Sequence, residues 1–318
     1  MVICIDRVLK YMSIFEKPEV IILKESSDAK LYLGKLQELR KTISDDTKIA
    51  DKIDREIAIT EAGIYGEDSI LFELKNSGMN LVVIHDLYIK TEDGRGAQID
   101  YWVITPYANV LIECKNLVGD IEINSRGEFI RTFEYKGKKN KEGIYSPITQ
   151  NERHMTVYKD CKKNDQNFAM KLMIDKYFDR YHKSIVVLAN PKTVINDRYA
   201  KKEIRDQVIR CDQLVGYLKS LKTDLKNNKK EMLQSGEKIL SMNIEDRKEY
   251  MIKFEKFLEE TKSLSNNKES NETEADNTMI CPSCGGKLIL RTAKKGPNEG
   301  NQFYGCSNYP KCKFIKNL

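Results

Sequence analysis

Hydrophobic and polar residues alternate with two different periods along the chain. Apolar residues recur every three or four positions in residues 29–58 and 217–259, which are also rich in Lys, Glu, Leu and Ile, and this spacing is typical of amphipathic helices. Short apolar or alternating stretches bounded by turn residues predict strands between these helices. The predicted strands are Asn80–Lys90, Ala97–Thr105, Val110–Leu117, Asp120–Asn124 and Glu128–Glu134.

The pattern changes again after the last of these strands. A helix is predicted to begin after Ser146-Pro147, because proline suits the first helical turn, and to run towards Lys162. Ser184–Ala189 is apolar enough for a buried strand, and Gln207–Cys211 predicts a weaker one. The order of helix, antiparallel strands, helix, two strands and helix predicts an α/β fold with a mixed sheet flanked by helices.

Three charged residues interrupt the apolar pattern of two neighbouring strands. Pro106–Asn109 predicts a turn, and pairing of Thr105 with Val110 places Asp100 opposite Lys115 and Glu113 opposite Trp102. Because alternate residues of a strand share a face, Asp100, Glu113 and Lys115 then project the same way. The strands around them are apolar, so these charges are predicted to lie beside a core, where an unpaired ion is costly.

Two nearby carboxylates suit a hard divalent cation, and magnesium typically uses one or two of them. A lysine beside them can orient or help deprotonate a water molecule and offset charge on a phosphate. These are the parts of a phosphodiester hydrolase. The alternative is an ordinary ion pair on a half-exposed sheet face, since Glu-x-Lys occurs by chance in many strands.

Motifs around this hairpin resemble the nuclease-related (NERD) domain of the PD-(D/E)XK nucleases. They lie in workable order over residues 61–158, and the resemblance extends more loosely to Lys219. The matching stretches are Gly63-Ile-Tyr-Gly-Glu67, Gln98-Ile-Asp100, Ile104-Thr-Pro-Tyr107, Ile112-Glu113-Cys-Lys115-Asn-Leu-Val-Gly119 and Ser146-Pro147-Ile-Thr-Gln150-Asn-Glu-Arg-His154.

The resemblance implies a restriction-endonuclease-like fold and a Mg²⁺-dependent (or Mn²⁺-dependent) DNA-cleaving site. Asp100 and Glu113 would be metal ligands and Lys115 the catalytic lysine. Glu67 would be a further acid at the metal, and Gln150 a polar group on the flanking helix.

Three residues near the motifs are less tied to this chemistry. His154 and Tyr158 follow Gln150 at steps of four, so they share a helix face, and either packing or substrate contact fits them. Cys114 points away from Glu113 and Lys115 and is predicted to fill the core. The basic run Lys136–Lys141 fits a solvated loop or a contact to phosphate.

The cysteines are concentrated at one end of the sequence. Four of the eight fall in Cys281-Pro-Ser-Cys284 and Cys306-Ser-Asn-Tyr-Pro-Lys-Cys312. Such close pairs can bind one tetrahedral Zn²⁺, and four sulfurs with no open position predict a structural ion. Free thiols in a disordered tail are the alternative. Cys4, Cys114, Cys161 and Cys211 are scattered and fit reduced thiols.

This cysteine-rich end is similar to the C-terminal zinc ribbons of bacterial type I topoisomerases, which bind single-stranded DNA. From Met279 onward seven Lys and Arg residues face one Glu, which equals the whole net charge of +6. Four thiolates on one zinc would leave the ribbon near +4. Aromatic faces and cations suited to single strands predict nucleic-acid contacts at Arg291, Phe303, Tyr304, Tyr309, Lys311 and Lys313.

Composition sets the domain plan and the compartment. Residues 263–278 hold one leucine, no aromatic residue and an acidic excess, which predicts a flexible linker. The plan is an N-terminal helical region (1–60), a nuclease-like domain (61–219), a helical extension (220–262), this linker (263–278) and the ribbon (279–318). No apolar run approaches the roughly 20 residues of a membrane span, and no export signal is evident, so a cytoplasmic location is expected.

The sequence thus predicts a Mg²⁺-dependent deoxyribonuclease whose ribbon anchors DNA. The alternative is a DNA-binding or scaffold protein that keeps the nuclease fold without turnover. An RNA-directed enzyme would use the same residues. Partners beyond DNA, whether a second copy of the chain or other DNA-processing proteins, are left open.

Overall fold

The computed structural model of the chain describes residues 17–45, 47–245, 249–273, 279–295 and 299–317. Two compact units, residues 1–255 and residues 256–318, make up the chain, and each is described by itself. Among the helices in these ranges, none combines the length and the hydropathy that a bilayer span requires.

A six-stranded mixed sheet forms the centre of the first unit. Its strands lie in the order β1-β2-β3-β4-β8-β10. The pairs β2–β3 and β3–β4 are antiparallel, and β1–β2, β4–β8 and β8–β10 are parallel. The bounds are β1 Val20–Lys24, β2 Leu81–Lys90, β3 Gly96–Ile104, β4 Asn109–Lys115, β8 His182–Leu188 and β10 Val208–Arg210.

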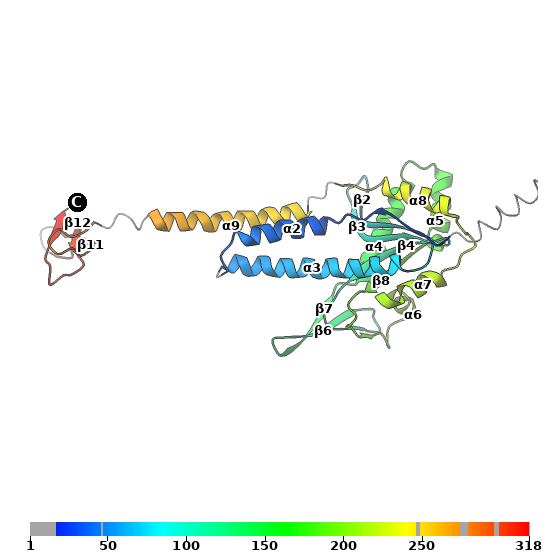
Figure 1. Cartoon of the computed structure of the whole chain (residues 1–318), viewed down its shortest axis with the longest axis horizontal. Coiled ribbons are helices and arrows are strands. Elements are labelled where there is room, and N and C mark those ends of the chain that lie inside the picture. Colours follow the sequence, from blue (N-terminus) through cyan, green and yellow to red (C-terminus); the bar gives the residue numbers. More distant parts are fainter. Residues whose placement is uncertain (1–16, 46, 246–248, 274–278, 296–298, 318) are drawn as a thin grey trace, which may run out of the picture. The chain divides into compact units, whose positions relative to one another are not determined.

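Helices cover both faces of this sheet (Figure 1). On one face α4, α5 and α8 pack against a core that contains Trp102 and Leu111. On the other face α3 and α7 pack against Tyr101 and Ile112. The helices are α2 Asp28–Lys41, α3 Lys48–Lys75, α4 Pro147–Lys163, α5 Phe168–Tyr181, α6 Lys202–Arg205, α7 Leu214–Ser220 and α8 Lys229–Leu240, with a 3₁₀ turn at Cys211–Gln213. The predicted α/β class, a mixed sheet flanked by helices, is confirmed.

A smaller sheet follows directly after β4. It consists of β5 Asp120–Ile123, β6 Phe129–Tyr135, β7 Lys138–Ile144 and β9 Ile195–Asn196, in the order β7-β6-β5-β9. Ile121 and Phe129 pack with Leu188 of β8 in a third apolar cluster. This cluster fixes the small sheet to the large one.

Three of the predicted elements differ from the structure. The helical stretch 217–259 divides among α7, α8 and α9 (Glu249–Thr273), and Asn228 caps α8 by accepting a hydrogen bond from Glu231 N at 3.0 Å. The helical stretch 29–58 is interrupted, because α2 ends at Lys41 and Thr47 caps a new helix by accepting a hydrogen bond from Ala50 N at 3.2 Å. The basic run 136–141, for which a loop was one of the two predictions, instead forms a turn and half of β7. A lysine-rich strand escapes prediction because it has no apolar alternation.

The predicted register of the β3–β4 hairpin was wrong by two residues. Val103 pairs with Val110, so Thr105 and Val110 are not partners. Thr105 instead holds a four-residue turn, in which its hydroxyl oxygen accepts from Ala108 N at 3.0 Å. A shift by two keeps each side chain on its face, so the expectation that Asp100 and Glu113 share a face is unaffected.

The second unit contains a three-stranded antiparallel ribbon. Its strands are β11 Leu288–Thr292, β12 Gln302–Cys306 and β13 Ile315–Asn317.

Helix α9, Glu249–Thr273, continues into the segment 263–278 that was predicted to be a flexible linker. Adding turns to an existing helix costs much less than starting one, so a strongly helical start can extend through polar residues. Residues 274–278 of the predicted linker lie outside the described ranges.

Gly66 of α3 allows the helix to approach β4 beside the charged residues. A Cβ atom at Gly66 would lie 2.7 Å from Asn116 Cβ and 3.1 Å from Cys114 Sγ. We expect Gly66→Ala to lower the free energy of unfolding by about 1–3 kcal/mol, the usual cost of overpacking. Urea unfolding followed by circular dichroism would measure this change.

Gly63, one turn earlier in the same helix, provides the matched control. A Cβ there meets nothing within 4 Å, so Gly63→Ala should be neutral or stabilise by up to about 1 kcal/mol. Equal effects of the two substitutions would contradict the close packing of α3 on β4.

Candidate functional site

The candidate site lies where β3 and β4 separate. Their backbone pairing ends at Tyr101 and Ile112, and the half-buried Asp100 then turns its side chain to β4, where Oδ2 accepts a hydrogen bond from Cys114 N at 2.7 Å. The Asp100 carboxylate therefore replaces a backbone partner at this point. It is held against the strand that carries Glu113 and Lys115.

An irregularity in β2 lies opposite Asp100. Asp86 adopts a φ of 55°, which is uncommon outside glycine. On either side of it the ladder pairs His85 with Tyr101 and Leu87 with Ile99. Before this point even-numbered residues such as Ile84 face the core that contains Trp102, and after it odd-numbered ones such as Leu87 do so. Strict alternation breaks next to Asp100.

Glu113, Lys115 and Gln150 contact one another directly. Lys115 Nζ lies 2.5 Å from Glu113 Oε1 and donates to Gln150 Oε1 at 3.2 Å. Glu113 is 2% exposed, and its second oxygen, Oε2, is buried without a hydrogen-bond partner. The lysine thus satisfies one oxygen of a buried carboxylate and leaves the other unsatisfied.

Burial and mutual repulsion act on the two carboxylates together. Desolvation, followed by the charge of Glu113, raises the pKa of Asp100 well above its usual range. Desolvation also raises the pKa of Glu113, and the nearby Lys115 ammonium opposes that rise. A cation between such groups would relieve both effects, because opposite charge favours the ionised form.

Glu67 of α3 approaches this pair but is held by a histidine. Its Oε2 lies 2.8 Å from His85 Nε2, and the other ring nitrogen lies 3.2 Å from the Glu25 carbonyl oxygen. Tyr101 donates its hydroxyl to the Glu67 carbonyl oxygen at 2.9 Å. Glu67 still contributes to the raised pKa of Asp100 through its charge. The structure therefore places Glu67 near Asp100, with one of its oxygens already engaged.

His85 was not among the residues predicted from sequence. It is 1% exposed and stacks on Tyr101, with ring centroids 4.5 Å apart. Both of its partners, a carboxylate and a carbonyl oxygen, are acceptors, so both contacts are hydrogen bonds only when His85 is doubly protonated or Glu67 carries a proton. The sequence signal was a His-Asp pair inside the otherwise apolar stretch Leu81–Lys90.

Of two further residues of α4, His154 lies at the candidate site and Tyr158 lies in the core. His154 Nδ1 is buried without a hydrogen-bond partner and lies 3.9 Å from Glu113 Oε2. Burial, followed by the charge of Lys115, lowers the pKa of His154 to about 4, so its imidazole is neutral at pH 7. Tyr158 is buried and packs on Trp102, with ring centroids 4.3 Å apart, which makes it a core residue.

The prediction that Cys114 fills the core is consistent with its packing against the cluster of Tyr101 and Ile112.

The donor set fits a hard divalent cation with few protein ligands. Asp100 and Glu113 offer carboxylate oxygens, and the unsatisfied Glu113 Oε2 is a buried acceptor that lacks a partner. Among the residues in the described ranges, a group of three or more acidic, histidine or cysteine side chains with closely spaced ligand atoms occurs only at the ribbon. Two carboxylates, with water and phosphate oxygens in the remaining positions, are the pattern of magnesium rather than of calcium.

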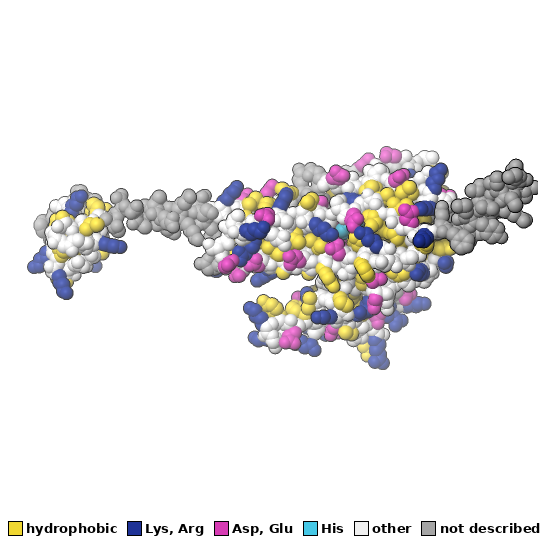
Figure 2. Space-filling view, viewed as in Figure 1, with side chains coloured by type: hydrophobic (Ala, Val, Ile, Leu, Met, Phe, Trp, Pro, Cys, Tyr) yellow, Lys and Arg dark blue, Asp and Glu magenta, His cyan; other side chains and the backbone are white. Residues whose placement is uncertain are grey.

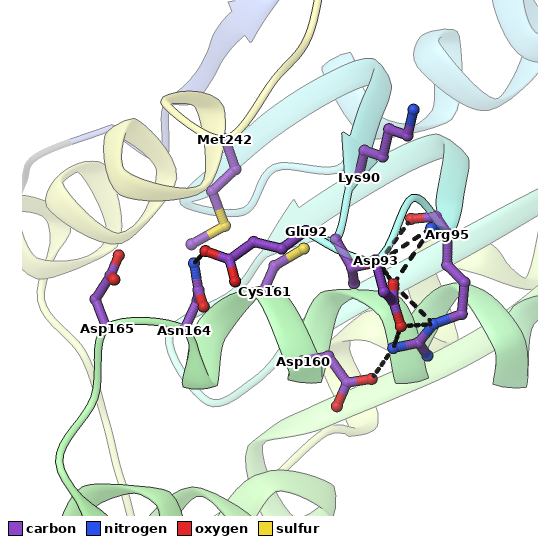
Figure 3. Close-up of a pocket in the computed structure, with 10 residues that line it drawn as sticks. Lys90, Glu92, Asp93, Arg95, Asp160, Cys161, Asn164, Asp165 and Met242 are labelled. Carbon is purple, nitrogen blue, oxygen red and sulfur yellow. Dashed lines mark hydrogen bonds and ion pairs between the residues drawn. The ribbon is translucent and has the colours of Figure 1, made fainter.

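A separate pocket of charged residues lies at the far end of the β2–β3 hairpin (Figure 3). Two of its carboxylates are paired, because Arg95 contacts Asp93 at 2.8 Å and Asp160 at 3.0 Å. Burial raises the pKa of Cys161 on its wall, which leaves a neutral thiol. The pocket contains no predicted site residue, and its groups lack the unsatisfied acceptor found at Glu113.

The second candidate site is the ribbon. The ligand atoms of Cys281, Cys284, Cys306 and Cys312 all lie within 4.8 Å of one another. Cys281 N donates to Gly286 O at 2.7 Å, which closes the first cysteine turn, and Gly285 within this turn has a φ of 71°. The four sulfurs form the site of a structural Zn²⁺.

The predicted nucleic-acid contacts of the ribbon differ in exposure. Tyr309 is 61% exposed, whereas Phe303 and Tyr304 are half-buried. The Arg291 guanidinium lies 5.9 Å from the Tyr309 ring centroid. Lys311 and Lys313 are exposed. A cation and an open aromatic face therefore lie close together at Arg291 and Tyr309.

Two family models match the chain, one in each unit. A family model of the nuclease-related domain matches residues 62–189, and a model of the topoisomerase DNA binding C4 zinc finger matches residues 278–318. No solved structure matches the chain significantly.

The similar curated proteins match in the zinc ribbon region. DNA topoisomerase 1 of Methanocaldococcus jannaschii is 60% identical over 37 residues, 12% of this chain and 4% of that protein. The uncharacterized protein YrdD of Escherichia coli is 43% identical over 42 residues, 13% of this chain and 21% of that protein. DNA topoisomerase 1 of Helicobacter pylori is 46% identical over 60 residues, 19% of this chain and 8% of that protein.

This chain thus spans only a small part of these relatives, and the likeness concerns one module. The two family matches and this likeness together identify two domains of the chain. The chain combines a nuclease-related (NERD) domain at residues 62–189 with a topoisomerase-type C4 zinc ribbon at residues 278–318.

Proposed function

We propose that the protein is a metal-dependent deoxyribonuclease that hydrolyses phosphodiester bonds at Asp100, Glu113 and Lys115. The observation that carries this proposal is the buried, unsatisfied Glu113 Oε2, next to a carboxylate whose pKa is raised and a lysine that is already in hydrogen-bond contact. A purely structural ion pair would satisfy both oxygens of a carboxylate at such depth, because an unmet buried acceptor is costly.

Each residue has a role in this proposal. Asp100 and Glu113 would hold Mg²⁺ or Mn²⁺, which when bound supplies Lewis-acid polarisation of a phosphodiester oxygen. Lys115 would orient the attacking water molecule and offset the negative charge that develops on the phosphate. Gln150 positions Lys115 through its side-chain oxygen. Glu67, oriented by His85, adds a further negative charge beside Asp100.

The ribbon is proposed to bind DNA, single strands in particular, through Arg291, Tyr309 and the nearby lysines. Its aromatic face and net positive charge support this role. Binding by the ribbon would raise the local concentration of substrate for the nuclease-related domain.

The proposal is tested by metal binding and cleavage measured on the same preparation. Single-stranded, linear and supercoiled DNA are incubated with Mg²⁺, with Mn²⁺, and without added divalent ions. We expect cleavage only with added metal. We also expect Asp100→Asn and Glu113→Gln each to weaken Mn²⁺ binding, measured by calorimetry, by about tenfold or more, because each substitution removes one charged ligand. If no DNA is cut while Mn²⁺ still binds, the protein is a DNA-binding module with a retained fold.

A further inference from the structure

The hairpin of β6 and β7 extends away from the six-stranded sheet (Figure 1). Its strands pair over seven positions, from Phe129 with Ile144 to Tyr135 with Lys138. A tight turn joins them, in which Lys136 has a φ of 52° and Gly137 a φ of 72°, as in the two-residue turns that suit hairpins. At about 3.4 Å per residue, the paired strands reach roughly 20 Å.

Cations occupy both faces of this hairpin. Arg131 and Lys138 lie on the face that continues from the apolar cluster at Phe129, and Lys139 and Lys141 lie on the other face. Lys136 lies at the tip. Two acidic residues, Glu134 and Glu142, leave a net charge of three positive units in Phe129–Ile144. Figure 2 shows Lys and Arg side chains gathered around the end of the hairpin.

Aromatic side chains alternate with these cations on the first face. The Arg131 guanidinium lies 4.4 Å from the Phe133 ring centroid, and Lys136 Nζ lies 5.4 Å from that of Tyr135. Tyr135 is 60% exposed. Lysines on the outer strand β7 could simply protect a sheet edge from pairing with another chain. Edge protection does not explain the exposed Tyr135 on the inner strand β6.

The base of the hairpin is fixed to the loop that directly follows Lys115. Arg131 Nε donates to Val118 O at 2.6 Å. Gly119 in the same loop has a φ of 100°, and a Cβ there would lie 2.3 Å from Thr132 O. Only two residues separate Lys115 from Val118, so the orientation of the hairpin is coupled to the end of β4 that carries the candidate site.

We infer that the β6–β7 hairpin binds duplex DNA by lying in its major groove and leads the duplex to the site at Asp100 and Glu113. A two-stranded ribbon fits a groove about 12 Å wide. A groove has a phosphate wall on each side, which matches cations on both faces, whereas a single strand would occupy one face only. The inference rests on the proposed function for its purpose, but hairpin binding itself does not require cleavage.

The test uses the full chain and replaces three exposed lysines of β7. The variant carries Lys138→Gln, Lys139→Gln and Lys141→Gln, and the control carries Lys48→Gln, Lys226→Gln and Lys230→Gln, which remove the same charge from exposed positions elsewhere. Fluorescence anisotropy without added divalent ions compares a 30-base-pair blunt duplex with the corresponding single strand at several salt concentrations. Omitting metal makes the readout independent of cleavage.

We expect the hairpin variant to bind the duplex about tenfold more weakly than the control, because three phosphate contacts are lost. The plot of log affinity against log salt should become shallower, with the magnitude of its slope smaller by roughly 2.7, and the affinity for the single strand should match that of the control. Equal losses on both substrates would overturn the duplex assignment. Duplex affinity equal to that of the control, with or without new aggregation, would overturn the inference and leave edge protection as the reason for these lysines.

Discussion

Replacing Lys115 with methionine is expected to slow DNA cleavage by a factor of about 10²–10³, the usual cost of removing one charge that acts on the developing phosphate charge. The substitution keeps an unbranched apolar stem and removes the ammonium group that contacts Glu113 and Gln150. Initial rates on supercoiled DNA at saturating Mg²⁺ would measure the loss. Lys183 is the matched control. It lies in β8 of the same sheet, and its Nζ donates to the Asp179 carbonyl oxygen.

Stability separates a catalytic loss from misfolding in this experiment. Without Lys115, Glu113 is a buried carboxylate without its cation, and breaking such a pair can cost about 3–5 kcal/mol. Adding Glu113→Gln to Lys115→Met should recover part of that stability, while cleavage stays lost. A Lys115→Met protein that folds and cuts as fast as the Lys183→Met control would contradict the catalytic role of Lys115.

The large elements of the fold were predictable because their apolar spacing is strong. The sheet strands β2, β3, β4 and β8 carry long apolar stretches, and α4 begins after Ser146-Pro147 as predicted. β7 was not predicted, since Lys138–Ile144 contains one large apolar residue and its strand form depends on pairing with β6. α5 was also missed, and its exposed Phe168 and Leu172 show that its apolar pattern does not face a single core.

The placement of Asp100 and Glu113 on neighbouring strands was predictable from the sequence, whereas their contacts were not. Asp100 and Glu113 could be placed on one face because an error of two residues in register leaves the face unchanged. The contact between Asp100 and Cys114 N depends on the separation of β3 from β4 next to Asp86, which local sequence does not encode in any simple pattern. The link between Glu67 and His85 joins α3 to β2 across the fold. Only tertiary structure reveals such partners.

Replacing Cys306 with serine is expected to unfold the ribbon and remove most of its contribution to DNA binding. In the described part of the ribbon the buried residues are Cys281, Gly305 and Cys306, so apolar burial supplies little stability. Zinc binding therefore supplies most of the folding free energy, which for structural sites is about 10–16 kcal/mol. Ser307→Ala, at the adjacent exposed position, is the control, and zinc content by atomic absorption measures the loss of metal.

The same variant distinguishes an accessory ribbon from a catalytic one. If the ribbon only binds DNA, Cys306→Ser should raise KM and flatten the salt dependence of affinity for single strands, while kcat at saturating DNA stays near that of the Ser307→Ala control, because uniform binding affects KM alone. Unchanged affinity for single strands would contradict a role of the ribbon in DNA binding. A large fall in kcat would instead mean that the ribbon takes part in the step at Asp100 and Glu113, because a group that contributes only to binding has no effect once substrate is saturating.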